Sequence, residues 1–388
     1  MSAHWLDRRR LLLYSSAIFA IYAALAILML VRFPHGVDAQ GHSVRPDFVV
    51  FWAATRLALS GDAAGAYDAA AIAPVEREAL PQLQGMGQWV YPPTFLLLLM
   101  PLGLLPFFWS YLAFMASTLF AYAVVLCRTV NSRAALMPAL AFPAVCLNLV
   151  EGQNGFLTAA LMGGAMLLLP RRPAWAGVLI GLLTIKPQLG PLLPLVLISA
   201  GQWRALWSAV LCALVLLALS VVALGAACLH GFAGSLDGFA AWAASDRGLL
   251  LTMPTFFAFF RLLGLSAAAA LLLHSVVAAA VAAATVWLWR GRRDPALCAA
   301  ALAAGTLLIS PYLLDYDLAL LAPAIAWFAV YAMRRGWHRG EREWLVLAWL
   351  LPLGTIAARQ LQLQFTPFLL LGLFLMILRR GRDAVPAG

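Results

Sequence analysis

Apolar runs of membrane-spanning length recur along the chain, separated by short polar or basic segments. A transmembrane helix needs about 20 mainly apolar residues, and its backbone hydrogen bonds are satisfied within the segment. The runs are continuous and rich in Leu and Ala rather than alternating, which argues against a β-barrel. The pattern predicts an all-α polytopic membrane protein, forming a single domain over residues 1–388, with about 10–13 transmembrane helices.

The individual runs predict where these spans lie. The first run, 11–31, follows three arginines and is too long for a signal peptide, so we expect an uncleaved span. The stretch 91–127 is interrupted by Pro101 and Pro106 and predicts either a crossing with an irregular part or a hairpin. Further spans are expected near 134–150, 155–169, 174–200, 204–227, 265–289, 296–310, 317–333, 344–358 and 364–378.

Arginine clusters orient these spans, because basic residues mark the cytoplasmic side. The clusters within 290–293, 334–339 and 379–382 indicate that both termini are cytoplasmic. Residues 33–91 then form a long first extracytoplasmic loop, and 228–261 form a second one. The threading of 92–203 is ambiguous. We favour the solution that makes 174–200 two half-helices with Lys186-Pro187-Gln188 at an extracytoplasmic turn.

The first loop contains a helical pattern. Phe48, Phe51, Trp52, Thr55 and Leu59 recur at helical spacing, which predicts an amphipathic helix over 47–59 lying on the membrane surface. A shorter helix is expected around 69–80.

Composition and motifs exclude several classes of function. The chain is 64% hydrophobic, and its net charge of +10 comes from arginines in short loops, so nucleic acid is not an expected partner. Its five cysteines are scattered without metal-ligand spacing. Gly-rich phosphate loops and the patterns GxSxG, CxxC and HExxH are absent from the sequence. We expect no metal and no cofactor.

Two charged residues interrupt the apolar region. Lys186 is the only lysine of the sequence, and Glu151 is the only acidic residue between Glu78 and Asp237. A charge at membrane depth normally faces a polar cavity or a partner. The alternative is that both residues cap helices at the interface or pair with one another.

Acidic residues near the predicted extracytoplasmic ends of spans are the other candidates. The segment Ser310–Asp317 carries Asp315 and Asp317 beside two tyrosines, which fits either a polar site or a solvated loop with an aromatic belt. Asp47 begins the predicted loop helix, where an anion is simply favourable. The apolar face that follows would hold its carboxylate at the lipid–water boundary, where an enzyme joining a lipid-borne group to an acceptor needs its base.

At these residues the chain resembles glycosyltransferase family 87 (GT87), membrane mannosyltransferases of the GT-C type that use polyprenyl-phosphate sugars. The similarity covers most of the chain and rests on an ordered set of short motifs. These are Asp47–Trp52 with Gly61 and Tyr67-Asp68, then Tyr91-Pro92-Pro93, Gly152-Gln153-Asn154, Ala176-Gly177 through Lys186-Pro187-Gln188, and Ser310-Pro311-Tyr312 to Tyr316-Asp317.

The resemblance implies an acidic catalytic base in the first loop, which falls on Asp47. A carboxylate can accept the proton of the attacking hydroxyl, and a cation can stabilise the departing phosphate. Lys186 is the first candidate for that cation, followed by Arg247 and Arg359. A single base predicts inversion at the anomeric carbon. The remaining candidates are substrate-binding residues: Tyr91, Gln153, Asn154, Gln188, Tyr312, Asp315 and Asp317.

The resulting hypothesis is transfer of mannose or a related sugar from a polyprenyl-phosphate donor to an extracytoplasmic lipid or glycan acceptor. The enzyme would span a bacterial-type plasma (inner) membrane, with its active site on the extracytoplasmic face. A transporter or flippase of lipid-linked sugars is the alternative, although the chain lacks the repeated halves typical of transporters. A structural subunit of an envelope complex would not explain the lysine within an apolar run.

Overall fold

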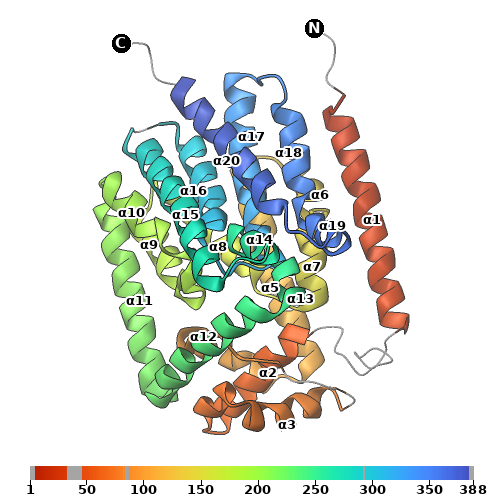
Figure 1. The fold of residues 1–388 in the computed structure, drawn as a ribbon, viewed down its shortest axis with the longest axis vertical. Coiled ribbons are helices and arrows are strands. Elements are labelled where there is room, and N and C mark those ends of the chain that lie inside the picture. Colours follow the sequence, from red (N-terminus) through yellow and green to blue (C-terminus); the bar gives the residue numbers. More distant parts are fainter. Residues whose placement is uncertain (1–4, 33–45, 82, 84–86, 292, 384–388) are drawn as a thin grey trace.

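The computed structural model describes residues 5–32, 46–81, 83, 87–291 and 293–383, and within these ranges every regular element is helical. Both termini lie at one end of the helical bundle, and α2 and α3 lie at the opposite end (Figure 1). The first part of the predicted extracytoplasmic loop, 33–45, lies outside the described residues. The all-α polytopic fold predicted from the sequence is confirmed.

Five helical segments of the described chain are long and apolar enough to cross a bilayer. Two segments of the predicted 134–150 span give a sixth crossing if they are counted together, although they are bent by 58°. Several other apolar helices are shorter, so the predicted 10–13 spans include runs that the structure builds from short or broken helices. The five segments are α5 (Phe107–Val130), α11 (Trp203–Leu224), α15 (Ala267–Arg290), η6 with α17 (Asp315–Leu320, Leu321–Arg335), and α18 to α19 (Glu341–Leu350, Gly354–Leu361, joined by η7, Leu351–Leu353).

The shorter helices follow the predicted runs closely. The first predicted span forms one continuous helix, α1 (Arg8–Arg32), along one side of the bundle (Figure 1). The Pro-interrupted stretch 91–127 becomes two short helices before α5. The shorter elements are α4 (Pro93–Leu99), η2 (Met100–Leu104), η3 (Arg133–Ala135), α6 (Leu136–Leu140), α7 (Pro143–Glu151), α8 (Gly155–Leu168), α9 (Pro173–Leu182), η4 (Leu183–Ile185), η5 (Pro187–Leu189), α10 (Leu192–Ser199), α16 (Pro295–Ile309) and α20 (Thr366–Asp383).

The first loop folds into α2 (Pro46–Leu59), η1 (Ala63–Tyr67) and α3 (Ala69–Ala79). The helix predicted over 47–59 is therefore present, but α2 does not simply lie on a membrane surface. Phe48, Phe51 and Trp52 are all buried, because η1, α3, η2 and α5 enclose the helix. Helical spacing identifies a face that avoids water, and it does not tell whether lipid or protein covers that face.

The segment predicted as the second extracytoplasmic loop, 228–261, is also largely helical. It contains α12 (Ala227–Ser245), α13 (Arg247–Thr252) and α14 (Phe256–Leu262). In Figure 1, α12 runs from the lower end of α11 past the first-loop helices toward α13, and it packs against η1.

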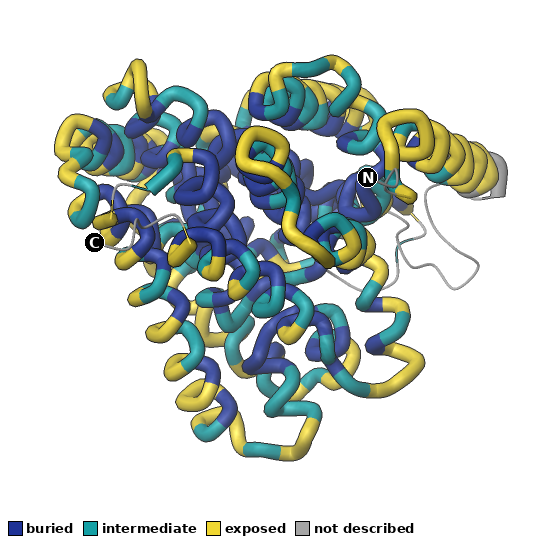
Figure 2. Tube along the Cα trace, turned by 90° about the horizontal axis from the view of Figure 1, so that it is seen from above, coloured by how far each residue is buried: buried dark blue, intermediate teal, exposed yellow. Residues whose placement is uncertain are grey.

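One large hydrophobic core joins α2, α5, α8, α16, α17 and α20. Figure 2 shows buried residues gathered in the centre of the molecule and exposed residues along its outer helices. Many exposed side chains are large and apolar, such as Phe120, Trp207 and Val222. An apolar exterior around a packed core is expected where lipid is the solvent. The core fixes the ends of α2, α7, α8, α9 and η6, which together carry the candidate site.

Candidate active site

Asp47 lies in the first turn of α2 and is hydrogen-bonded to Gln153, the second residue after α7. The Gln153 Nε2 donates to Asp47 Oδ2 at 2.5 Å. The start of α2 is anchored by Phe48, whose ring contacts those of Tyr111 and Phe114 at centroid distances of 5.4 and 5.8 Å. The carboxylate is thus attached to packed core and not to a free loop.

Gly152 makes this approach possible. It ends α7 in the left-handed conformation, with φ of 73°, and its amide donates to the Asn148 carbonyl. A Cβ at this position would lie 2.5 Å from the Cβ of Phe48. Glycine is needed here both for the backbone conformation and for contact between α7 and α2.

Replacing Gly152 should therefore separate these two helices. We expect Gly152→Ala to lower stability by about 1–3 kcal/mol and to reduce activity together with the melting temperature. Gly201→Ala is the matched control, because Gly201 has a similar positive φ of 67° but open space around its Cβ. Equal losses of melting temperature in the two variants would show that contact with Phe48 is unimportant.

The orientation of the Gln153 side chain is fixed by two donors. Its Oε1 accepts from the Tyr91 hydroxyl at 3.0 Å and from the Asn154 amide at 3.1 Å. The Nε2 must therefore face Asp47. Burial, and to a lesser extent the neighbouring Asp47 carboxylate, raises the pKa of the Tyr91 phenol. Tyr91 consequently remains a hydrogen-bond donor at neutral pH.

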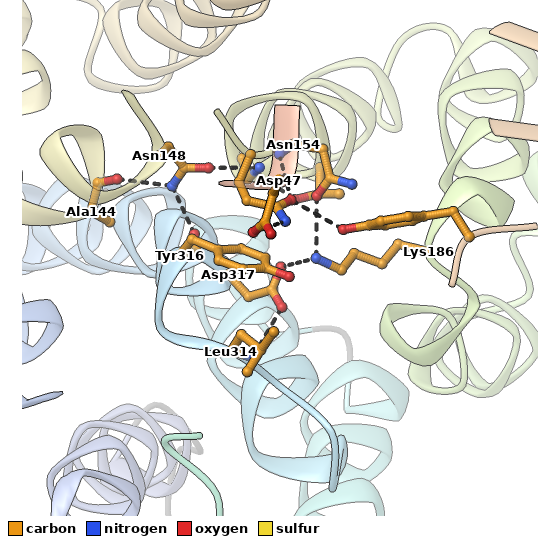
Figure 3. Close-up of polar contacts among 12 residues, drawn as sticks. Asp47, Ala144, Asn148, Asn154, Lys186, Leu314, Tyr316 and Asp317 are labelled. Carbon is orange, nitrogen blue, oxygen red and sulfur yellow. Dashed lines mark hydrogen bonds and ion pairs between the residues drawn. The ribbon is translucent and has the colours of Figure 1, made fainter. Parts of the chain in front are cut away.

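Lys186 occupies the break between η4 and η5, the two short turns that separate α9 from α10. Its Nζ is buried and lies 2.5 Å from Asp317 Oδ1 and 3.2 Å from Asn154 Oδ1 (Figure 3). The ammonium also lies 4.6 Å from the centroid of the Tyr316 ring. The predicted broken helix is present, and its lysine points into a polar cluster.

Asp317 belongs to η6, and both of its carboxylate oxygens have partners. Oδ1 pairs with Lys186, and Oδ2 accepts from the Leu314 amide at 3.3 Å. Asp315 and Asp317 are 5% and 1% exposed, so they do not form the solvated loop considered above. Lys186 pairs with Asp317, so the alternative in which it pairs with Glu151 is wrong.

Asn148 fixes η6 against α7 and α8. Its Nδ2 donates to the carbonyls of Ala144 and Tyr316, and its Oδ1 accepts from the Gly155 amide at 2.8 Å (Figure 3). This fully buried amide therefore ties α7, the start of α8 and η6 together. Sequence reasoning missed Asn148 and gave the Tyr316 ring no role in the site. The only available signal for Asn148 was an amide within an apolar run.

The environment of the Asp47 carboxylate raises its pKa above the usual value of an aspartate. Burial raises its pKa, while the Gln153 hydrogen bond and the Lys186 charge oppose that rise. A carboxylate with a raised pKa is a stronger base once ionised. Perturbed acids next to a fixed cation are common in active sites, although structural networks also contain them.

Arg247 and Arg359 lie together in a neighbouring region. Arg247 donates to the Gln362 side chain at 2.9 Å, and Gln362 donates to the Arg359 carbonyl at 2.7 Å. Arg359 and Gln362 line a cavity of about 590 Å³ with Trp242, Leu249 and Leu251. The Arg359 guanidinium also attracts the carboxylates of Glu151 and Asp315. This cavity combines one cation, Arg359, with apolar walls, and that cation interacts with two of the acids near the site.

The remaining predicted residues are placed differently. Tyr312 packs between Phe239 and Phe257, with ring centroids 6.1 and 5.4 Å away, and does not join the Asp47 network. Gln188 is half-buried in η5 and makes no hydrogen bond within the described part of the chain. The structure thus brings together Asp47, Tyr91, Gln153, Asn154, Lys186 and Asp317.

Comparison with known proteins identifies the family of this chain. The model of glycosyltransferase family 87 matches residues 89–311, which is more than half of the chain. The chain belongs to glycosyltransferase family 87. It is therefore a membrane glycosyltransferase. No curated protein and no solved structure matches it.

The GT87 match divides the candidate residues into two groups. Tyr91, Gln153, Asn154, Lys186, Gln188 and Arg247 lie within it. Asp47 precedes the match, and Tyr312, Asp315, Asp317 and Arg359 follow it. The contacts of Asp47 with Gln153 and of Asp317 with Lys186 therefore connect the matched region of this glycosyltransferase to the segments on either side.

Proposed function

We propose that this glycosyltransferase moves a sugar, mannose or a related one, from a polyprenyl-phosphate donor to an extracytoplasmic lipid or glycan acceptor, with Asp47 as general base. The observation that carries the proposal is the ordered contact of Asp47 with Gln153 beside the Lys186–Asp317 ion pair. The donor and the acceptor extend the family activity to specific substrates, and the position of Asp47 suits a lipid-borne reactant.

In the proposed reaction the acceptor hydroxyl attacks the anomeric carbon of the donor sugar. Asp47 takes the hydroxyl proton as the new carbon–oxygen bond forms, and the bond from the anomeric carbon to the phosphate oxygen breaks. The leaving polyprenyl phosphate departs as a stable anion, so no general acid is required. A cation near that phosphate stabilises charge that grows in the transition state.

The cavity beside Arg359 suits the donor phosphate and its lipid. Its arginine is exposed and carries no ion pair among the described residues, and Leu249, Leu251 and Trp242 offer an apolar wall. Lys186 is already compensated by Asp317 and lies deeper. In this proposal Arg359, with Arg247 behind it, meets the phosphate first. Lys186 acts as the second cation, beside the Asn154 side-chain N–H that is buried and unpartnered in the described structure.

The contacts of Asp317 support inversion. A retaining double displacement needs a second carboxylate free to act as nucleophile. Asp317 is bound to Lys186 and to the Leu314 amide. Among the described residues Asp47 carries no ion pair, so of these two acids it is the one that can meet an acceptor hydroxyl, which supports a single displacement.

The discriminating experiment uses purified wild-type protein in lipid vesicles containing labelled polyprenyl-phospho-mannose and a crude acceptor lipid extract. We expect label to move to the acceptor with inverted anomeric configuration. Donor that crosses between leaflets while remaining chemically intact would favour the flippase alternative and overturn the proposal. The same assay with polyprenyl-phospho-glucose and an arabinose donor tests the choice of sugar.

The pH dependence tests the base separately. Transfer needs ionised Asp47, so the rate should fall as pH drops through its raised pKa. Gln153→Met removes a hydrogen bond that lowers this pKa, and the acid limb of the kcat profile should move to higher pH. Gln188→Met is the matched control, because Gln188 does not touch the network in the described structure. An unmoved acid limb in Gln153→Met would mean that Asp47 does not control it.

A further inference from the structure

A second cavity lies between the first-loop helices and α12. It has a volume of about 330 Å³ and is lined by η1, α3, the segment before α4, and one face of α12. Small-molecule sites usually have about this volume or more, with aromatic walls and a few polar groups. Neither the family match nor the proposed reaction assigns a role to this cavity.

Its chemistry differs from that of the cavity beside Arg359. Tyr67 and Trp89 supply aromatic surface, while Gln88, His230 and Ser235 supply hydrogen-bonding groups. None of the described lining residues is Lys, Arg, Asp or Glu. Such a lining is poorly suited to a phosphate and well suited to an uncharged ligand with many hydroxyls, because aromatic side chains offer an apolar face together with a polar edge.

Trp89 provides a buried donor that lacks an acceptor. The side chain is 2% exposed, and its indole N–H makes no hydrogen bond in the described structure, although the Tyr67 phenol is close enough to interact. A buried donor without a partner costs about 1–3 kcal/mol. A ligand hydroxyl in the cavity would remove that cost.

The cavity is connected to Asp47 through Tyr91. The Tyr67 hydroxyl donates to the Tyr91 carbonyl at 2.9 Å, and the rings of Trp89 and Tyr91 are 5.4 Å apart. The Tyr91 hydroxyl in turn donates to Gln153, which holds Asp47. A ligand seated against Tyr67 and Trp89 would therefore lie on the far side of the Tyr91 ring from the proposed base.

Glycines of α12 shape the wall opposite these aromatic rings. A Cβ on Gly231 would come within 2.8 Å of the Tyr67 ring, so this glycine permits the helix to pack. Gly234 and Gly238 also line the cavity, but a Cβ on either would meet nothing within 4 Å. The absence of side chains at these two positions leaves space that packing does not use.

We infer that this cavity is the acceptor subsite and binds an uncharged sugar ring of a glycan or glycolipid acceptor. The inference rests on the proposed function, since it gives the reaction its second substrate. Tyr67 and Trp89 line the space for the ring, and the open faces of Gly234 and Gly238 leave room for it. Because Tyr91 lies between this cavity and Asp47, the ring held here is remote from the attacking hydroxyl and positions the acceptor without touching the base.

Filling the cavity tests the assignment. Gly234→Leu adds a side chain where the structure has open space, and leucine favours the helix more than glycine does. We expect the KM for acceptor to rise about tenfold or more, with the KM for donor unchanged. Ala233→Leu, at an exposed position of the same helix that does not line the cavity, is the control and should match the wild type. A changed donor KM, or an unchanged acceptor KM, would overturn the inference.

A binding measurement separates this inference from the proposed chemistry. Octyl mannoside and octyl glucoside serve as neutral probes, titrated below micellar concentration into nanodisc-embedded Asp47→Asn protein with intact α12. We expect saturable binding that Gly234→Leu weakens about tenfold and Ala233→Leu leaves intact. Binding that survives Gly234→Leu would refute the subsite. If Asp47→Asn still transfers sugar while the binding result holds, only the assigned base is wrong.

Discussion

Asp47→Asn should fold like the wild type and lose sugar transfer by about 10²–10⁴-fold, the usual contribution of a general base. The amide is nearly isosteric with the carboxylate, so the packing of α2 around Phe48 stays unchanged. It cannot accept the proton of an attacking hydroxyl at neutral pH. The loss should appear in kcat, with small changes in the KM for donor and acceptor, because a general base acts in the transition state.

The matched control for Asp47→Asn is a variant of another acid in the same loop. Asp68→Asn is suitable because Asp68 caps α3 through the Ala70 amide, and asparagine caps helices equally well. That variant should retain wild-type turnover and melting temperature. Transfer by Asp47→Asn at a rate similar to that of Asp68→Asn would exclude Asp47 as the base and direct attention to Glu151, another acid that interacts with Asp47 and Asp317.

The helices were predictable because a membrane span can be recognised from its own stretch of sequence. Runs of apolar residues, prolines and arginine clusters gave most of the elements, including the break at Lys186 that separates α9 from α10. Asp47, Gln153 and Lys186 could be selected for the same reason: each is a polar group whose type or position is unusual in its surroundings. The resemblance to GT87 then ordered these groups into one hypothesis.

The pairing of these residues could not be predicted, because it depends on helix packing between distant segments. Lys186 meets Asp317 from a segment more than a hundred residues away, although Glu151 is much nearer in sequence. The burial of α2 likewise depends on η2 and α5, which its own periodicity does not reveal. Asn148 organises three segments through backbone carbonyls and amides, and such contacts leave little trace in the residue pattern.

Breaking the Lys186–Asp317 pair should have the largest effect on stability. Lys186→Met leaves a buried carboxylate without its cation, and Asp317→Asn leaves a buried ammonium. Removing one partner of a buried pair typically costs about 3–5 kcal/mol, whereas removing both can be nearly neutral. We therefore expect each single variant to melt at a much lower temperature, and Lys186→Met/Asp317→Asn to recover most of the loss. Thermal unfolding in the same detergent for all four proteins measures the coupling.

The double variant also separates stability from chemistry. If Lys186 supports Asp47 and the donor phosphate, Lys186→Met/Asp317→Asn should still use the donor poorly. The acid limb of its kcat–pH profile should lie at higher pH, because the Lys186 charge that lowers the Asp47 pKa is gone. Arg380 and Glu341 form a second buried pair at 2.6 Å, near the end of the bundle that carries both termini, and provide the matched cycle. Arg380→Met/Glu341→Gln should regain stability and turnover together. Full turnover in the restored Lys186 double variant would reduce that ion pair to a structural role, because the site would then work without either charge.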